Sequence, residues 1–229
     1  MPRVITRTVY TFQELLDLHK AGKVKEKAID KARQWLRDAN TDGEWYEWVF
    51  ETWTDALAQI GFADAKIAFS GFWCQGDGAS FTATIDIAKL ADFLATEIEP
   101  RDCIDGQPED FRPWIVHKCD GKPTNAKYRR VAGLGDYLDE HAVERTSHHY
   151  SHKYTCATRL SVRDYDRAGK IDALLRQCRE DAEKLRLDLC EAIYSDLDKE
   201  YEDQTGDEAI AEFAAGNDYT FTISGEREG

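Results

Sequence analysis

The sequence predicts an α+β fold with N-terminal helices, a central and mostly antiparallel sheet, and a long C-terminal helix. Apolar residues recur at helical spacing before residue 62, alternate with polar residues over 66–86, and return to helical spacing after residue 166. We expect a single domain over 1–229. Within it, 1–62 is helical, 63–162 is mainly sheet, and 163–229 holds a long helix, a short helix and a final strand.

The charge balance narrows the classes of partner. Asp and Glu total 44 against 30 Lys and Arg, which gives a formal net charge of -14. Such a chain is repelled by phosphate backbones, so the charge disfavours direct nucleic-acid binding and favours basic protein partners. We see no apolar signal core, no stretch that could span a bilayer, and no Cys-x-x-Cys pair among six cysteines. These features predict a protein of the reducing cytoplasm with no membrane partner.

The N-terminal third is predicted to be a short strand at 4–8 followed by three helices. Thr11 and Glu14 form a capping box that begins the first helix, which ends near Gly22. The second helix covers 23–39. The third covers 44–60, with a second capping box at 41–44 and Gly61 after its end.

The third helix carries an acidic stripe, formed by Glu44, Glu47, Glu51 and Asp55. Like charges one turn apart cost about 0.2–0.5 kcal/mol per pair in an isolated helix, so the stripe should meet a counter-charge. One interpretation pairs it with the lysine stripe of the preceding helix: Lys20, Lys23, Lys27 and Lys31. The other interpretation is an acidic surface for a partner. The stripe lacks the Glu-x-x-His of carboxylate metal sites, so no metal is predicted.

A β-hairpin over 66–86 is the most distinctive stretch. Ile67 and Phe69 on one arm, and Phe81, Ala83 and Ile85 on the other, are predicted to face the core. Its tip, residues 71–78, is rich in glycine but leads into a strand and lacks Gly-Lys-Ser/Thr, so it is not a phosphate loop.

Two interpretations of the tip remain open. In one, the glycines make a turn and Trp73 folds onto the core. In the other, Trp73, Gln75 and Asp77, with Phe72 beside them, form a recognition surface for a protein or a nucleobase.

The rest of the chain alternates between loops and regular elements. We expect a helix at 87–96, a surface loop at 99–110, strands at 112–118 and 127–132, and a loop at 133–140. Residues 142–162 suit one bent strand or two, which gives a sheet of five or six strands. After the long helix, a short helix at 207–215 and a strand at 219–223 precede a polar tail.

The long helix, 166–201, has a heptad-like seam: Ile171, Leu175, Cys178, Ala182, Leu185, Leu189 and Ala192. The seam either packs on the sheet or pairs with a second copy in a homodimer.

No catalytic signature is present. On a straight strand His148 and His152 are about 13 Å apart and His148 and Cys156 about 26 Å, too far to share a metal. Neither a nucleophile elbow nor a zinc-protease motif occurs. We therefore expect a protein without a cofactor that is not an enzyme.

Five motifs, in order along the chain, carry a resemblance. They are Tyr10-Thr-Phe-Gln-Glu-Leu, Lys27-Ala-Ile-Asp-Lys-Ala-Arg33, Glu44-Trp-Tyr-Glu-Trp-Val-Phe-Glu51, the hairpin Phe69-Ser-Gly-Phe-Trp-Cys-Gln-Gly-Asp-Gly-Ala-Ser-Phe81, and Asp207-Glu-Ala-Ile-Ala-Glu with Asn217-Asp-Tyr-Thr-Phe-Thr. The chain resembles a family of small bacteriophage proteins, some labelled as the antitoxin of a toxin–antitoxin stability system. The resemblance implies an accessory protein that acts in the host cytoplasm.

The leading hypothesis is a phage-encoded acidic binding protein that sequesters or inhibits a host protein, such as a defence nuclease or a toxin. The alternative is a protein that binds a nucleotide, or an enzyme acting on one, through the hairpin tip.

Overall fold

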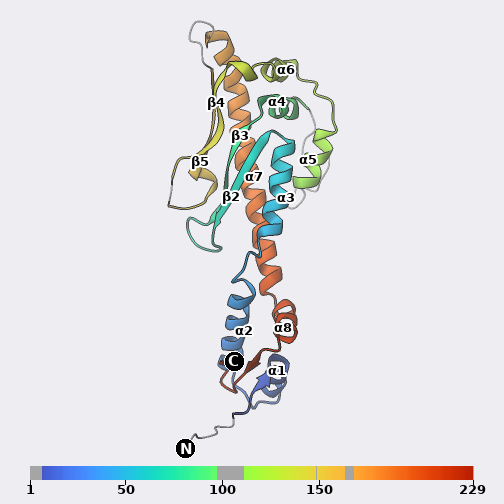
Figure 1. Ribbon diagram of the computed structural model, residues 1–229, viewed down its shortest axis with the longest axis vertical. Coiled ribbons are helices and arrows are strands. Elements are labelled where there is room, and N and C mark those ends of the chain that lie inside the picture. The colour runs from blue at the N-terminus through green and yellow to red at the C-terminus, as the bar shows by residue number, and fades with distance from the viewer. Residues whose placement is uncertain (1–6, 97–110, 148, 163–167, 229) are drawn as a thin grey trace, which may run out of the picture. The chain divides into compact units, whose positions relative to one another are not determined.

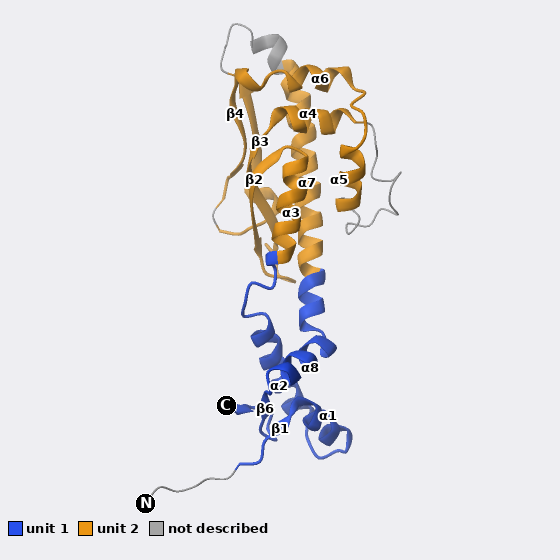
Figure 2. Ribbon diagram, turned by 45° about the vertical axis from the view of Figure 1, so that its right-hand side comes forward, with its two compact units in different colours: residues 1–47, 199–229 blue, residues 48–198 orange. Residues whose placement is uncertain are grey.

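The computed structural model describes residues 7–96, 111–147, 149–162 and 168–228. It confirms the α+β class and the long C-terminal helix (Figure 1). The chain divides into two compact units, coloured separately in Figure 2: unit 1, residues 1–47 with 199–229, and unit 2, residues 48–198. The single domain stays a prediction, but the first and last stretches of the chain form one unit. Among the helices that the structure describes, none combines the length and the hydropathy that a membrane span requires.

Unit 1 joins the two ends of the chain. Its elements are β1 (Tyr10–Thr11), α1 (Phe12–Lys20), α2 (Glu26–Asn40), α8 (Asp207–Gly216), β6 (Thr220–Phe221) and β7 (Arg227–Glu228). The three strands form an antiparallel sheet in the order β1-β6-β7. Strand β7 lies in the predicted polar tail, which the sequence did not indicate as a strand. Most of the strand predicted at 4–8 lies outside the described residues.

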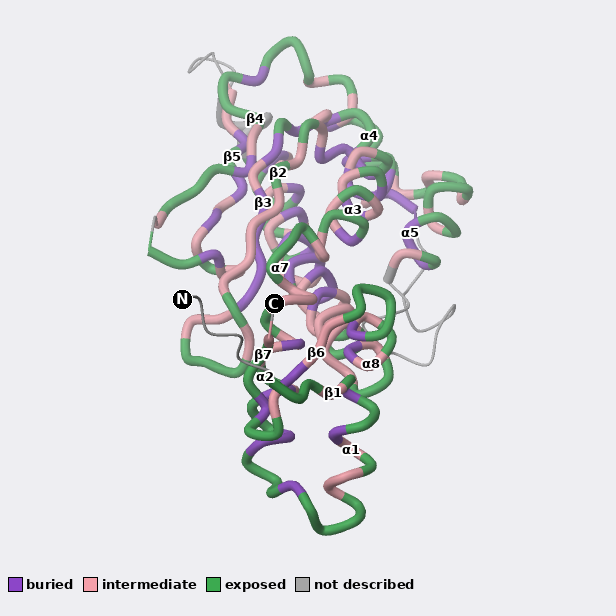
Figure 3. The backbone as a smooth tube through the Cα atoms, turned by 60° about the horizontal axis from the view of Figure 1, so that its bottom comes forward, coloured by how far each residue is buried: buried purple, intermediate pink, exposed green. Residues whose placement is uncertain are grey.

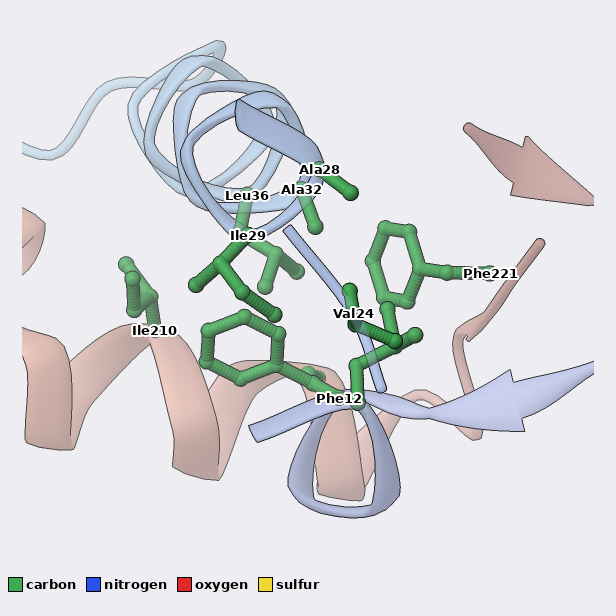
Figure 4. Close-up of a cluster of buried hydrophobic side chains, with 10 residues drawn as sticks. Phe12, Val24, Ala28, Ile29, Ala32, Leu36, Ile210 and Phe221 are labelled. Carbon is green, nitrogen blue, oxygen red and sulfur yellow. The ribbon is translucent and has the colours of Figure 1, made fainter. Parts of the chain in front are cut away.

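The capping box predicted at Thr11 is confirmed. The Glu14 amide donates to the Thr11 hydroxyl at 3.2 Å, and the Glu14 carboxylate accepts from the Thr11 amide at 2.8 Å. This start turns the apolar face of α1 towards α2 and α8, where ten buried residues form one core (Figure 4). Phe12 and Phe221 meet edge to face in it, with ring centroids 6.2 Å apart.

Unit 2 contains the larger sheet. Its elements are α3 (Glu47–Gln59), β2 (Phe62–Ser70), β3 (Gly78–Ile85), α4 (Ile87–Ala95), α5 (Phe111–Cys119), α6 (Ala126–Ala132), β4 (Leu138–Arg145), β5 (Cys156–Val162) and α7 (Ala168–Thr205) as far as residue 198. Short 3-10 helices cover Gly135–Tyr137 and Lys153–Thr155. The strands are antiparallel in the order β2-β3-β4-β5.

The predicted hairpin is confirmed as β2 and β3, which pair from Phe62 with Ile85 to Ser70 with Gly78. Phe81, Ala83 and Ile85 are buried as expected, whereas Ile67 and Phe69 are half-buried. The described sheet of unit 2 has four strands, not five or six, because two of the predicted strands are helices.

Those two strands, predicted at 112–118 and 127–132, are α5 and α6. Pro113 lies in the first turn of α5, where the missing amide costs nothing. Asn125 caps α6 by accepting from the Lys127 amide at 3.0 Å, and Tyr128 and Val131 are buried three residues apart on one face. That spacing is helical, and the sequence-based strand prediction was wrong.

The connection before α3 also differs from the prediction. The Thr41 hydroxyl donates back to the Arg37 carbonyl at 2.9 Å, so Thr41 closes α2 and does not cap the next helix. Helix α3 begins at Glu47 and is followed by Gly61, whose φ of 98° is the left-handed conformation expected there.

The long helix is confirmed, and Figure 1 shows α7 running along the sheet of unit 2. Its predicted seam is buried at Leu175, Cys178, Ala182, Leu185, Leu189 and Ala192. Figure 3 colours buried segments of the chain purple, and some of them lie on α7. Ile171 lies outside the described side chains. Because these residues serve the core of unit 2, a homodimer through this helix stays a prediction and would need other residues.

Candidate functional site

The β2–β3 loop has a fixed backbone. The Asp77 carboxylate accepts from the Cys74 amide at 2.5 Å, and the Asp77 amide donates to the Cys74 carbonyl at 3.2 Å. Gly71 and Gly76 have φ of 51° and 98°, and Trp73, a non-glycine residue, has φ of 66°. Such a conformation costs on the order of 1 kcal/mol for a bulky side chain and is found where the surroundings impose it. Asp77 therefore shapes the loop, a role the sequence did not indicate.

Phe72 and Trp73 have opposite roles. The Phe72 ring stacks on Tyr194 of α7, with centroids 5.5 Å apart and planes at 25°, and also meets Phe69 at 5.8 Å. Trp73 is 72% exposed, and Gln75 is exposed beside it. The interpretation in which Trp73 folds onto the core was wrong, because Phe72 makes the core contact.

The β4–β5 connection, described at residues 146–147 and 149–155, packs against this loop. The Ser151 amide donates to the Ser70 hydroxyl at 2.5 Å. A side chain at Gly76 would meet the Tyr150 ring at 3.6 Å, and one at Gly78 would meet His152 at 2.9 Å. Gly78 is therefore required for the close approach of the second loop. A Cβ at Gly76 would make only ordinary contact with Tyr150, so that glycine is required by its φ of 98°.

Together the two loops expose three aromatic side chains: Trp73 at 72%, Tyr150 at 58% and Tyr154 at 67%. We call Trp73, Gln75, Tyr150 and Tyr154 the aromatic tip. Tyr150 and Tyr154 fall within 142–162, which was predicted as one bent strand or two, but they lie in the connection between β4 and β5. The tyrosine-rich composition of that stretch was the only signal in the sequence, and it did not indicate contact with the hairpin.

Arg186 of α7 holds the second loop in place and is fully buried. Its Nη1 donates to the Lys153 carbonyl at 2.6 Å, while Nε and Nη2 donate to the Glu183 carboxylate at 3.0 and 2.5 Å. Glu183 also accepts from the Thr158 amide of β5 at 2.9 Å. Sequence reasoning missed Arg186, because a lone arginine in a charged helix normally faces solvent.

The electrostatics of this network follow from its contacts. Burial by itself would raise the pKa of Glu183, but hydrogen bonds from Arg186 and Thr158 outweigh it and hold that pKa below its ordinary value. On α7, beside the β2–β3 loop, burial and the nearby Asp77 carboxylate raise the pKa of Tyr194.

The cysteines differ in environment. Burial raises the pKa of both Cys178 and Cys190 to about 12, so both are thiols at neutral pH. Cys74 in the loop is exposed. Among the described residues, no group of three or more histidine, cysteine or acidic side chains is placed to hold a metal ion. His148 lies outside those residues.

The four residues of the acidic stripe are exposed. Glu44 precedes α3, Glu47 begins it, and Glu51 and Asp55 are exposed along it. Neither Glu51 nor Asp55 forms an ion pair with any described residue of unit 2.

The lysine stripe has other partners. In unit 1, Lys20 pairs with Asp17 at 3.8 Å and Lys31 with Glu226 at 2.7 Å. Within unit 1 these two lysines therefore pair with other carboxylates, and both interpretations of the acidic stripe stay predictions.

Comparison with known protein families gives one match: residues 45–207 match the family described as "Domain of unknown function (DUF8835)". The match includes the whole of unit 2, and with it both loops of the aromatic tip. No curated protein and no solved structure matches the chain. The chain therefore belongs to this family, and the family description states no activity.

Proposed function

We propose that this member of the DUF8835 family is a protein-binding protein that docks on its partner through the aromatic tip. The main support is Trp73, which is 72% exposed although the loop that carries it is fixed by Asp77 and by the stacked Phe72 ring. A large aromatic side chain on a rigid support loses little entropy on binding, which is why tryptophan and tyrosine dominate interface hot spots.

The net charge of -14 supports a partner with a positively charged surface. A basic partner would be steered towards the molecule, and its association rate would fall with salt. In line with the resemblance to bacteriophage proteins, we expect that partner in the cytoplasm of a bacterial host, and we propose that binding blocks its activity.

Capture from host lysate at low salt tests the proposal. Trp73→Ala should lose the captured protein, with an affinity loss of about thirtyfold for a hot-spot residue of about 2 kcal/mol. Tyr137→Ala is the matched control, since Tyr137 is an aromatic residue of unit 2 that is 53% exposed outside the aromatic tip. Equal capture by the Trp73 and Tyr137 variants would refute docking through the tip.

A panel of nucleotides distinguishes protein binding from the alternative function, which is nucleotide binding through the hairpin tip. Thermal shift of the wild type with each nucleotide should show no change under our proposal. A shift that Trp73→Ala abolishes would replace protein docking with base stacking at the same surface.

A further inference from the structure

A second surface of unit 2 has the character of a binding groove. Residues of helices α3 and α5 line an open groove with a volume of about 650 Å³. Its lining includes Trp48, Glu51 and Asp55 of α3 and Arg112, Pro113 and Val116 of α5. None of these residues belongs to the aromatic tip, so the groove is a separate site.

The floor of the groove is apolar and open to solvent. Trp48 is 58% exposed and Val116 is 52% exposed. Single exposed apolar residues are ordinary, but two that line one cavity provide an anchoring point for an apolar side chain. Trp48 is also held in place, because the Arg112 guanidinium lies 5.5 Å from its ring centroid.

The rim of the groove is negative. Glu51 and Asp55 are one helical turn apart, exposed, and without an ion-pair partner among the described residues of unit 2. The positive charge of Arg112 is matched by Asp196, 3.2 Å away, whose side chain is only 9% exposed. Asp196 in turn accepts from the Trp53 indole at 2.9 Å, which holds that ion pair in place.

From this arrangement we infer that the α3–α5 groove binds a cationic amphipathic segment of a partner protein. An apolar side chain of the segment contacts Trp48 and Val116, and lysine or arginine side chains pair with Glu51 and Asp55. Charge complementarity selects this occupant, because Glu51 and Asp55 are the charged lining residues that have no ion-pair partner among the described residues of unit 2.

The test uses the full chain and a fluorescein-labelled amphipathic peptide of lysine and leucine, with binding followed by anisotropy at low ionic strength. We expect saturable binding that weakens with salt. Glu51→Gln with Asp55→Asn should weaken it about fivefold, as expected for two exposed ion pairs. Val116→Ser should weaken it without changing the salt dependence, because it removes an apolar contact only.

The matched control is Glu140→Gln with Glu180→Gln. Both residues are exposed carboxylates of unit 2 that line a different cavity, so the pair makes the same change in net charge. This control should bind like the wild type. Equal weakening in both double variants, or no binding by the wild type, would overturn the proposal.

Light scattering identifies the competing occupant. A dimer that Glu51→Gln with Asp55→Asn converts to a monomer would mean that a second copy of the chain fills the groove, and would overturn a partner segment. Trp73→Ala should leave peptide binding unchanged, so failure of the groove and failure of the aromatic tip give different results.

Discussion

Replacing Arg186 with alanine should lower the free energy of unfolding of unit 2 by about 3 kcal/mol. Arg186 is fully buried and donates three strong hydrogen bonds, two to Glu183 and one to the Lys153 carbonyl. In the Arg186→Ala variant the Glu183 carboxylate still accepts a hydrogen bond from the Thr158 amide, whereas the Lys153 carbonyl loses the hydrogen bond from Arg186.

The expected loss of unfolding free energy depends on how far water can reach the Glu183 carboxylate once Arg186 is removed. Removing one partner of a buried ion pair costs about 3–5 kcal/mol. The Glu183 side chain is 35% exposed, so water can replace part of the lost hydrogen bonding and the lower end of that range applies. For a unit of this size the melting temperature should fall by about 10 °C.

Urea unfolding followed by tryptophan fluorescence measures the effect. Arg179→Ala is the matched control, because Arg179 lies two turns earlier on α7. Among the described residues its side chain makes one hydrogen bond, 3.5 Å long, to the Leu160 carbonyl. We expect that control to cost about 0.5 kcal/mol or less. If the two variants have the same stability, the buried network does not hold the second loop on α7.

Three further predictions concern other parts of the chain. Gly225→Ala should destabilise unit 1 by about 2 kcal/mol or more, because the φ of Gly225 is 78° and a Cβ there would lie 1.9 Å from the Ala28 carbonyl oxygen. Gly216→Ala is the control and should not destabilise the unit, because a Cβ at Gly216 meets nothing within 4 Å. Thermal melts compare the two variants. Alkylation of the native protein, mapped by mass spectrometry, should label Cys74 quickly and Cys190 only after unfolding, and early labelling of Cys190 would contradict its burial. The pKa of Glu183 is lower in the folded protein than its unfolded value of 4.5, so this carboxylate stabilises the folded state above pH 4.5. That stability is lost as the pH falls through the folded-state pKa, and Glu183→Gln should therefore flatten the dependence of stability on pH below about 4.5.

Local signals in the sequence predicted several elements correctly. The Thr11 capping box, the hairpin with its glycine-rich loop, and the seam of α7 are all confirmed. Each depends on residues close together in the chain, whose hydrogen bonds or periodicity specify the structure without help from distant segments.

The strand predictions for α5 and α6 failed for the opposite reason. The two stretches, 112–118 and 127–132, have only seven and six residues, which is too short for the spacing of apolar residues to distinguish a strand from a helix. Tertiary contacts decide between them: Trp114 of α5 packs on Phe93 with ring centroids 5.4 Å apart, and Tyr128 of α6 donates a hydrogen bond to Asp181 of α7.

The candidate site divides in the same way. From the sequence alone, the hairpin tip, with Trp73 and Gln75, was already a candidate surface, because glycines between alternating strands demand a turn and the residues among them must lie in it. Only the tertiary structure decided that Phe72 packs on Tyr194 while Trp73 is exposed, that a second loop brings Tyr150 and Tyr154 to the same place, and that the two ends of the chain form one unit. The physical reason is range: a turn is specified by the residues within it, whereas burial and exposure depend on which distant segments compete for the same apolar contacts.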